Sequence, residues 1–212
     1  MGLSFSYHSY LPKITAEQVE MLYLFKEVFL DWNARINLIS RKDTELFEVK
    51  HVLHSLSIAK FIRFNTGARV LDLGTGGGFP GIPLAIFFPE VSFILVDSIE
   101  KKMKVVADIV EKLQLKNVKV YRGRVEEMDL EVDYVVSRAV APMNDLIHWT
   151  KNIIMEGQVG NLPNGWVVLK GGDLTEELGP YRKSAEIQNI SDYWSDEFFE
   201  TKRIVYLARQ IL

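Results

Sequence analysis

A glycine-rich turn directly after a short apolar run is the feature that most constrains the fold of this chain. The stretch reads RVLDLGTGGGFPGIP over residues 69–83, so a run typical of a buried strand ends at Gly74, Gly76 and Gly78. Glycine tolerates positive φ and lets a ligand approach the backbone closely. A strand, a glycine turn and a helix in this order are typical of the ligand-binding turn of doubly wound α/β folds. We therefore expect a parallel sheet with a ligand at the end of this strand.

Further short apolar runs alternate with helical patterns, as a doubly wound α/β fold requires. β-Branched residues dominate these runs, which is typical of strands buried on both faces of a parallel sheet. The clearest crossover helix covers 99–114. The expected parallel strands are 69–74, 92–97, 118–123, 134–139 and 165–172.

The C-terminal part of the chain departs from this alternation. An acidic and aromatic stretch follows the fifth strand, and another apolar run comes at 202–209 with no long helix before it. Two late strands without a crossover helix predict a C-terminal β-hairpin, in which one strand runs against the parallel set.

The N-terminal part is predicted to be helical. Thr15 and Gln18 have the spacing of a capping box, and an apolar stripe at three- and four-residue steps follows as far as about Asn37. A second helical stretch covers 44–63. Since no repeat or linker interrupts the chain, we expect one structural domain, with residues 1–64 as a helical extension packed on a core of residues 65–212.

The glycines fit two ligand-binding patterns. Gly76, Gly78 and Gly81 satisfy the dinucleotide fingerprint, whereas Asp72 with Gly74, Gly76 and Gly78 satisfies the D-x-G-x-G-x-G pattern of S-adenosylmethionine-dependent enzymes. The second pattern is favoured because it sets the tight turn directly at the strand end. The expected C-terminal hairpin also favours a methyltransferase over a nicotinamide-dependent enzyme.

Asp97 ends the second expected strand. A carboxylate at this place can accept hydrogen bonds from both ribose hydroxyls of a bound nucleoside. The alternative is a helix-capping acid beside Ser98. The combination of the glycine turn and this acid favours nucleoside binding.

Several motifs together resemble the bacterial small-subunit ribosomal RNA guanine-N7 methyltransferases, a family also called glucose-inhibited division protein B. The similarity implies a Rossmann-like class I methyltransferase fold and methyl transfer from S-adenosylmethionine to N7 of a guanine in 16S ribosomal RNA. One departure is His54, where the family usually has Asp. The matching stretches occur in family order and are WNARINLIS (32–40), HVLHSL (51–56), LDLGTGGGFPGIPLAI (71–86), LVDSIEKK (95–102), RVEE (124–127), SRAVAP (137–142) and LKGG (169–172).

The same resemblance implies particular cofactor contacts. They come from Gly74 and Phe79 in the glycine turn, from Val125 and Glu126 after the third strand, and from Arg138 at the end of the fourth. With the residues already considered, the expected cofactor site comprises Asp72, Gly74, Gly76, Gly78, Phe79, Asp97, Val125, Glu126 and Arg138.

The expected chemistry needs no general base, because guanine N7 already exposes a lone pair. The chain has no cysteine, which excludes covalent attack on a pyrimidine C6. We therefore expect no catalytic acid or base, and the candidates for positioning are Arg138, Lys170 and Asn37. Arg138 and Lys170 suit phosphate or base contacts, with simple ion pairing as the alternative. Asn37 is either a polar helix end or a substrate contact, and only the resemblance favours the latter.

His51 and His54 lie three residues apart on a predicted helix and could share a metal ion. With four histidines and no cysteine in the chain, polar groups at the surface or beside the site are the better interpretation. We expect no metal site.

Charge is distributed unevenly along the chain. Residues 98–124 carry eight basic and three acidic side chains, whereas residues 173–200 carry two basic and eight acidic ones. Such a dipolar surface can steer an anionic substrate, although solvated helix faces are the alternative. With no signal-peptide pattern and no membrane-length apolar run, we expect a cytoplasmic protein that acts on ribosomal RNA within the small subunit or its precursor.

Three other functions remain open at this point. One is a methyltransferase that acts on another RNA position or on a small molecule. Another is an NAD-dependent oxidoreductase. The last is a binding module that has kept the fold without the activity.

Overall fold

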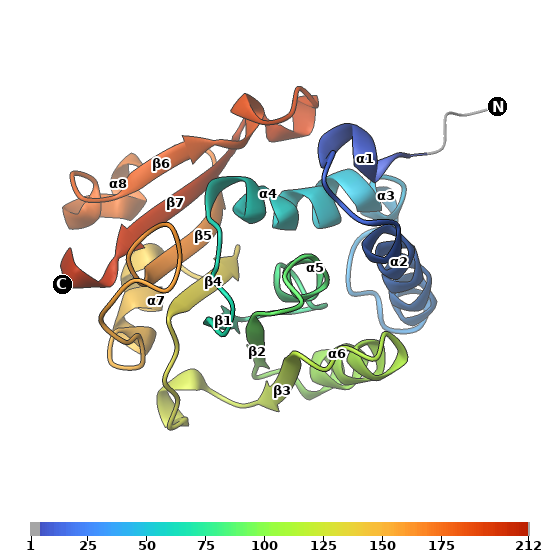
Figure 1. The fold of residues 1–212 in the computed structure, drawn as a ribbon, viewed down its shortest axis with the longest axis horizontal. Helices are drawn as coiled ribbons and strands as arrows, with labels where there is room; N and C mark the ends of the chain where they lie inside the picture. The colour runs from blue at the N-terminus through green and yellow to red at the C-terminus, as the bar shows by residue number, and fades with distance from the viewer. Residues whose placement is uncertain (1–4, 212) are drawn as a thin grey trace.

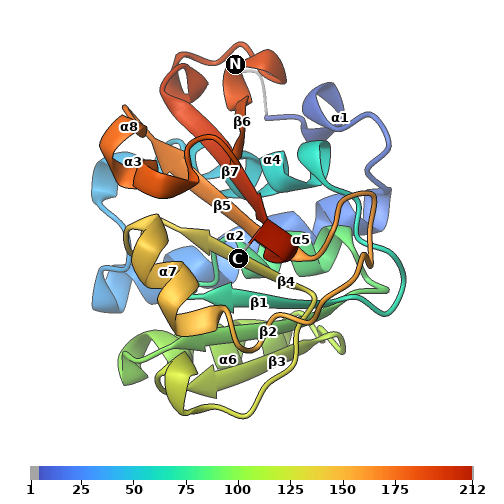
Figure 2. The same ribbon diagram turned by 90° about the vertical axis from the view of Figure 1, so that its left-hand side faces the viewer.

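The apolar runs form the centre of one mixed sheet (Figure 1, Figure 2). A computed structural model describes residues 5–211, and within this range the sheet has seven strands in the order β3-β2-β1-β4-β5-β7-β6. Strands β1 to β5 pair in parallel, and β7 runs antiparallel to both β5 and β6. The bounds are β1 (Arg69–Leu73), β2 (Ser92–Asp97), β3 (Val118–Arg122), β4 (Tyr134–Arg138), β5 (Gly165–Gly171), β6 (Glu186–Asn189) and β7 (Lys202–Ala208).

The doubly wound sheet and its antiparallel late strand are confirmed, but two details of the prediction are wrong. The third strand was expected to be buried on both faces, whereas β3 forms an edge of the sheet and is largely exposed. The short strand β6 was not predicted at all. It lies at the opposite edge with the mostly exposed sequence EIQN, so it lacks the apolar run by which a buried strand is recognised.

Helices cover both faces of the sheet (Figure 1). One face carries α4, α5 and α6, with α2 packed outside α5 and α6, and the other face carries α7. The helices are α1 (Tyr7–Tyr10), α2 (Ala16–Ile36), α3 (Arg41–Thr44), a π-helical turn (Glu48–Leu53) that continues into α4 (His54–Phe61), α5 (Gly81–Phe87), α6 (Glu100–Lys112), α7 (Met143–Thr150) and α8 (Thr175–Leu178). Single 3₁₀ turns lie at Val125–Glu127, Gly179–Tyr181, Ile190–Asp192, Glu197–Phe199 and Arg209–Ile211. None of the helices within residues 5–211 is both long enough and apolar enough to cross a membrane.

The helix α2 joins the N-terminal part of the chain to the glycine turn. Its predicted capping box is present, and the Gln18 amide also donates to the backbone carbonyls of Ile86 and Phe87 at the end of α5. Deeper in the layer, the rings of Phe25, Phe29, Phe47 and Phe79 pack against one another with centroids 5.2 to 5.9 Å apart. Because Phe79 belongs to the glycine turn, the helical extension supports the turn directly.

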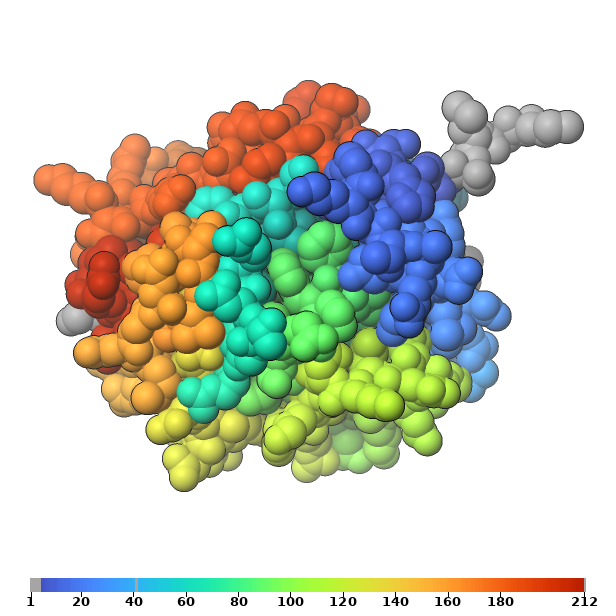
Figure 3. All heavy atoms as spheres, in the orientation of Figure 1, coloured from blue at the N-terminus to red at the C-terminus, as the bar shows by residue number. Residues whose placement is uncertain are grey.

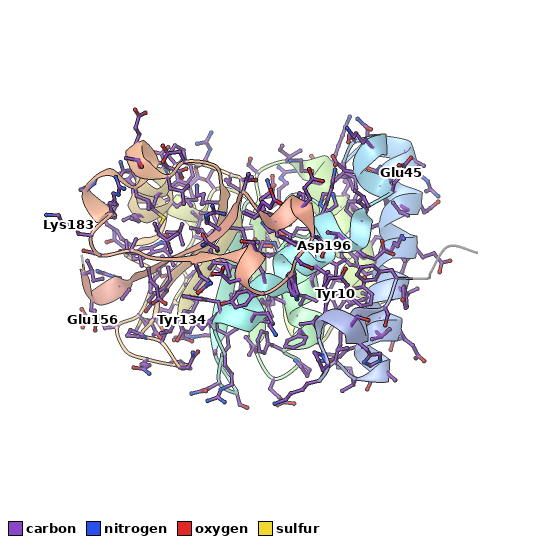
Figure 4. The ribbon with its side chains drawn as sticks, turned by 90° about the horizontal axis from the view of Figure 1, so that it is seen from above. Tyr10, Glu45, Tyr134, Glu156, Lys183 and Asp196 are labelled. Atoms are coloured by element: carbon purple, nitrogen blue, oxygen red, sulfur yellow. The ribbon has the colours of Figure 1, made fainter. Side chains whose placement is uncertain are left out.

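The segment before β7 also contacts the N-terminal part of the chain. The Tyr10 hydroxyl donates to Asp196 over 3.3 Å, and the two side chains lie together in Figure 4. The Trp194 indole lies edge-on to the Tyr10 ring. In the space-filling view the N-terminal helices and the C-terminal segment form adjoining surfaces (Figure 3). We propose that these contacts make residues 1–64 part of the same folding unit as residues 65–212.

Candidate functional site

The site lies where the carboxyl ends of the central parallel strands meet. Asp72 of β1 is in register with Leu95 of β2 and with Val136 of β4. Parallel strands end at a common edge of the sheet, and the arrowheads of β1 and β3 point to the same side in Figure 2. Since the chain leaves β1 toward β2 on one side and reaches β4 on the other, this edge is a topological switch point, where open α/β sheets bind ligands.

The Asp72 side chain closes the glycine turn from below. Its Oδ2 accepts hydrogen bonds from the Thr75 hydroxyl at 2.6 Å and from the Gly81 backbone N–H at 2.8 Å. The carboxyl group is fully buried, and this burial raises its pKa from 3.8 to about 7, against the opposing effect of its two hydrogen bonds. Asp72 therefore ties the end of β1 to the start of α5.

The glycines of the turn have the backbone that the sequence predicts. Gly74, Gly76 and Gly78 have φ values of +67°, +58° and +97°, where side chains are strained. A Cβ at Gly74 would also lie 2.4 Å from a methyl group of Val140. The loop after β4 therefore packs directly on the glycine turn.

The Asp97 carboxylate bonds to the backbone on both sides of the site. Its Oδ2 accepts from the Gly76 N–H at 3.0 Å, and its Oδ1 accepts from the Ile99 N–H at 2.9 Å, just before α6 begins. Each carboxylate oxygen has a second lone pair for another donor. The side chain is only partly buried and lines the hollow described next.

A hollow of about 530 Å³ opens at this edge of the sheet. The first hollow, as we call it, brings together seven of the nine residues expected at the cofactor site: Gly74, Gly76, Phe79, Asp97, Val125, Glu126 and Arg138. Asp72 and Gly78 lie outside its lining and shape the turn from behind. Further lining residues were not predicted. Leu38, Ile39, Ile99 and Lys102 lie in stretches that match the family, whereas Phe29 and Trp149 lie outside any such stretch.

Arg138 connects the first hollow to the helix layer. Its guanidinium lies 4.7 Å from the ring centre of Phe79 and donates to Nδ1 of His51 at 3.2 Å and to the Lys50 carbonyl at 3.4 Å. Burial lowers the pKa of Arg138 to about 10, while the Asp72 carboxyl acts in the opposite direction. The side chain therefore stays protonated at neutral pH and is held in place from three sides.

His54 is buried and His51 is half-buried, so neither is the surface group that the sequence suggested as one interpretation. Burial and the Arg138 charge lower the pKa of His51 to about 3, and the same causes hold the pKa of His54 well below its ordinary value. The Nε2 atom of each ring is buried without a hydrogen-bond partner among the described residues. Within residues 5–211, no group of three His, Asp or Glu side chains could hold a metal ion.

A second hollow of about 430 Å³ adjoins the first. The two share Arg138, Ala139 and Val140, which follow one another at the end of β4. Lys170 lines the second hollow, where its ammonium donates to the Ala141 carbonyl at 2.5 Å and lies 2.5 Å from Oε1 of Glu177. Of the two interpretations of Lys170, the ion pair is therefore present in the structure.

Asn37 lies apart from both hollows. It ends α2 in the left-handed conformation, with φ +52°, and lines a third hollow with Asn33, Arg35 and Thr44. Asn33 has a structural role, because its amide both accepts from the Ile39 N–H and donates to the Ile39 carbonyl. The structure therefore does not bring Asn37 together with Arg138 and Lys170.

Comparisons with known proteins agree on one family. A family model described as rRNA small subunit methyltransferase G matches residues 18–206. The chain is 50% identical to the ribosomal RNA small subunit methyltransferase G of Bacteroides thetaiotaomicron, covering 93% of this chain and 96% of that protein. It is 49% identical to the protein of the same name from Christiangramia forsetii, covering 93% of each.

A solved structure shares the fold at much lower identity. It is the precorrin-6y C5,15-methyltransferase from Geobacter metallireducens, with a TM-score of 0.54 and 13% identity over 81% of this chain and 90% of that one. The sheet described above is therefore that of a Rossmann-like class I methyltransferase.

The lowered pKa values of His51 and His54 predict how the stability of the fold depends on pH. The folded protein keeps His51 and His54 neutral, whereas the unfolded chain takes up a proton on each below about pH 6.5. Their stabilising contribution is thus complete above that pH and is lost as the pH falls toward the folded pKa, which is about 3 for His51. Asp72 acts in the opposite sense, because its contribution is complete below pH 3.8 and is lost as the pH rises to about 7.

The substitution His54→Phe isolates one of these contributions, since a phenyl ring can keep the contacts with Phe198 and Phe199. We expect the slope of the free energy of unfolding against pH to decrease by about 1.4 kcal/mol per pH unit between about pH 6 and 5. Urea unfolding at a series of pH values measures this slope. An identical slope in the wild type and the variant would show that His54 takes up its proton in the folded state as well.

Proposed function

The chain belongs to the rRNA small subunit methyltransferase G family, and on that premise we propose that it transfers a methyl group from S-adenosylmethionine to N7 of a guanine in small-subunit (16S) ribosomal RNA. The observation that carries the proposal is the first hollow. It sets the glycine turn, the Asp97 carboxylate and the 3₁₀ turn after β3 around one space at the switch point of the sheet.

The residues of the first hollow fit S-adenosylmethionine as the cofactor. Asp97 has acceptor capacity left for ribose hydroxyls after its two backbone hydrogen bonds. Val125 and Glu126 lie on the segment after β3 and suit the adenine edge, the first through its backbone and the second through its carboxylate. Phe79 and Arg138 lie toward the wall shared with the second hollow, and we assign the methionine end of the cofactor to them.

The chemistry needs positioning more than proton transfer. S-Adenosylmethionine supplies a methyl group bonded to a positively charged sulfur. The lone pair of guanine N7 forms the new N–C bond as the S–C bond breaks, so the product purine carries the positive charge and no proton has to leave. The rate then depends on alignment and electrostatics. Arg138, fixed by Phe79, His51 and the Lys50 carbonyl, provides one rigid wall for that alignment.

We further propose that the substrate is the ribosomal RNA within the small subunit or its precursor, which places the protein in the cytoplasm. Several basic side chains of residues 98–124 are exposed, among them Lys101, Lys116 and Arg124, and Arg124 borders the first hollow. Others pair with acids, as Lys104 and Arg122 do with Glu100. A local basic surface of this kind suits the backbone of a folded RNA more than the bases of a linear sequence.

The cofactor assignment predicts a loss of affinity on removing the Asp97 carboxylate. Asp97→Ala should weaken S-adenosylmethionine by about 2–3 kcal/mol, or roughly 30- to 150-fold, which is the scale of charge-assisted hydrogen bonds. Isothermal titration calorimetry measures the affinity for S-adenosylmethionine. In the same experiment the protein should not bind NAD. Asp129→Ala, an exposed acid outside the hollow, is the control. If the folded Asp97→Ala protein binds S-adenosylmethionine with wild-type affinity, Asp97 does not contact the cofactor.

The proposed product predicts a specific cleavage of the RNA. N7 alkylation leaves a fixed positive charge on the purine, so the methylated nucleotide is sensitive to borohydride and then to aniline. Small subunits from a strain without this enzyme, incubated with the protein and S-adenosylmethionine, should yield RNA that breaks at one new position. Subunits incubated without the protein are the control. Incorporation of a tritiated methyl group without a new break would show that the protein methylates the RNA, and it would exclude N7 as the acceptor atom.

A further inference from the structure

The second hollow combines apolar and charged side chains, and apart from Arg138 the proposed cofactor contacts lie outside it. Its lining includes the apolar side chains of Val140, Pro142 and Leu169. Facing the same space are the charged side chains of Arg138, Lys170, Glu177 and Lys202, together with His54. A volume of about 430 Å³ lies within the range of pockets for small ligands. Apolar surface with a few fixed polar groups is what holds and orients a planar base.

The position of the second hollow suits the methyl acceptor. It shares Arg138, Ala139 and Val140 with the first hollow, so ligands in the two spaces would lie side by side along one short segment at the end of β4. This segment is tightly constrained. Ala139 has φ +53°, which is uncommon for a residue other than glycine, and Val140 packs on Gly74.

Glu177 is the acidic side chain of the second hollow, and it is held in a fixed place. Lys170, whose side chain is only 8% exposed, lies 2.5 Å from Oε1 of Glu177 and donates to the Ala141 carbonyl. The buried ammonium thus links α8 to the loop after β4. A carboxylate has about four acceptor positions, and one cation cannot occupy all of them. The Oε1 atom of Glu177 is buried, whereas the side chain as a whole is 27% exposed, so the acceptor capacity toward the hollow belongs to Oε2.

We propose that Glu177 is the residue that selects guanine, by accepting hydrogen bonds from N1–H and from the exocyclic N2 amino group of the acceptor base. This inference rests on the proposed function and names a specificity-determining residue for it. Among the four RNA bases, only guanine presents two adjacent donors on its Watson–Crick edge. The Oε2 atom of Glu177 has two lone pairs and can accept from both of these donors, whereas adenine and cytosine would meet it with a ring nitrogen acceptor and uracil with carbonyl oxygens.

The geometry of guanine also directs N7 correctly. In the six-membered ring, C2, which carries the amino group, lies opposite C5, to which N7 is bonded. A carboxylate that holds the N2 side therefore turns N7 to the far end of the base. Glu177 lines the second hollow and not the first. The wall shared by the two hollows consists of other residues, Arg138 to Val140. Lys202, whose ammonium lies 5.0 Å from the ring centre of Phe198, provides a cation for the phosphate of the same nucleotide.

The test compares guanosine with inosine, which lacks only the N2 amino group. Small subunits are reconstituted with 16S RNA that carries either nucleoside at the methylated position, and kcat/KM is measured for each. For the wild type we expect guanosine to be favoured by about 10- to 100-fold, the effect of one hydrogen bond to a charged group. In Glu177→Gln the activity on guanosine should fall by at least about 10-fold and the preference should drop to about 3-fold or less, because the Gln carbonyl oxygen would face the Lys170 ammonium and the amide NH2 would meet the guanine donors.

Two controls separate recognition from structure. Glu176→Gln changes the preceding, exposed carboxylate of the same helix and should keep both the activity and the preference of the wild type. The affinity of Glu177→Gln for S-adenosylmethionine should equal that of the wild type, since Glu177 lies outside the first hollow.

The outcomes are distinct. If Glu177→Gln lowers the activity on guanosine and inosine equally, Glu177 only holds Lys170 in place and the inference is overturned. A wild-type protein that methylates guanosine and inosine equally well would also overturn it, while leaving the proposed function intact. Failure of the wild type to methylate guanosine-containing subunits at all would overturn the proposed function and this inference together.

Discussion

The buried carboxyl group of Asp72 is the constraint on which the site depends. Its Oδ2 holds the Thr75 hydroxyl and the Gly81 N–H at once, so the glycine turn is closed between the end of β1 and the start of α5. Losing either hydrogen bond would leave a buried polar group without a partner, at a cost of about 1–3 kcal/mol. Burial of the Asp72 carboxyl group raises its pKa to about 7. With the turn closed, Gly74 can contact Val140 and Gly76 can donate to Asp97.

Arg138 extends this constraint into the helix layer. The guanidinium packs on Phe79 of the same turn and donates to His51 and Lys50 on the π-helical turn, so residues far apart in the sequence form one rigid unit. The short segment that Arg138 begins borders both hollows. A reaction that moves one carbon atom between two ligands needs such an arrangement, because both ligands must be held within bonding distance and in line. We regard this shared wall as the feature that turns a nucleoside-binding fold into a methyl-transfer site.

Much of this architecture could be predicted from the sequence, because local patterns determine it. The central strands and the positive φ values of Gly74, Gly76 and Gly78 follow from β-branched runs and a glycine spacing that few folds share. The edge strands were harder to predict from the sequence, since β3 is largely exposed and β6 carries no apolar run. Fewer side chains of an edge strand are buried, so its sequence shows a weaker apolar pattern.

Contacts between distant segments could not be predicted in this way. Nothing near His51 in the sequence indicates that its ring meets Arg138, 87 positions later. The same holds for Asn37, whose motif resembles the family but whose side chain lies at a separate hollow. Pattern and resemblance place residues on elements, whereas packing decides which of them share a space.

The most direct test of this account is a crystal structure of the protein with S-adenosylhomocysteine and guanosine monophosphate. The account predicts ribose hydroxyls within hydrogen-bond distance of Asp97, adenine beside Val125, and the sulfur at the wall formed by Arg138 to Val140. The guanine should lie in the second hollow with N7 toward that sulfur. An adenosine moiety in the second hollow, or a ribose away from Asp97 with the guanine outside both hollows, would contradict the account.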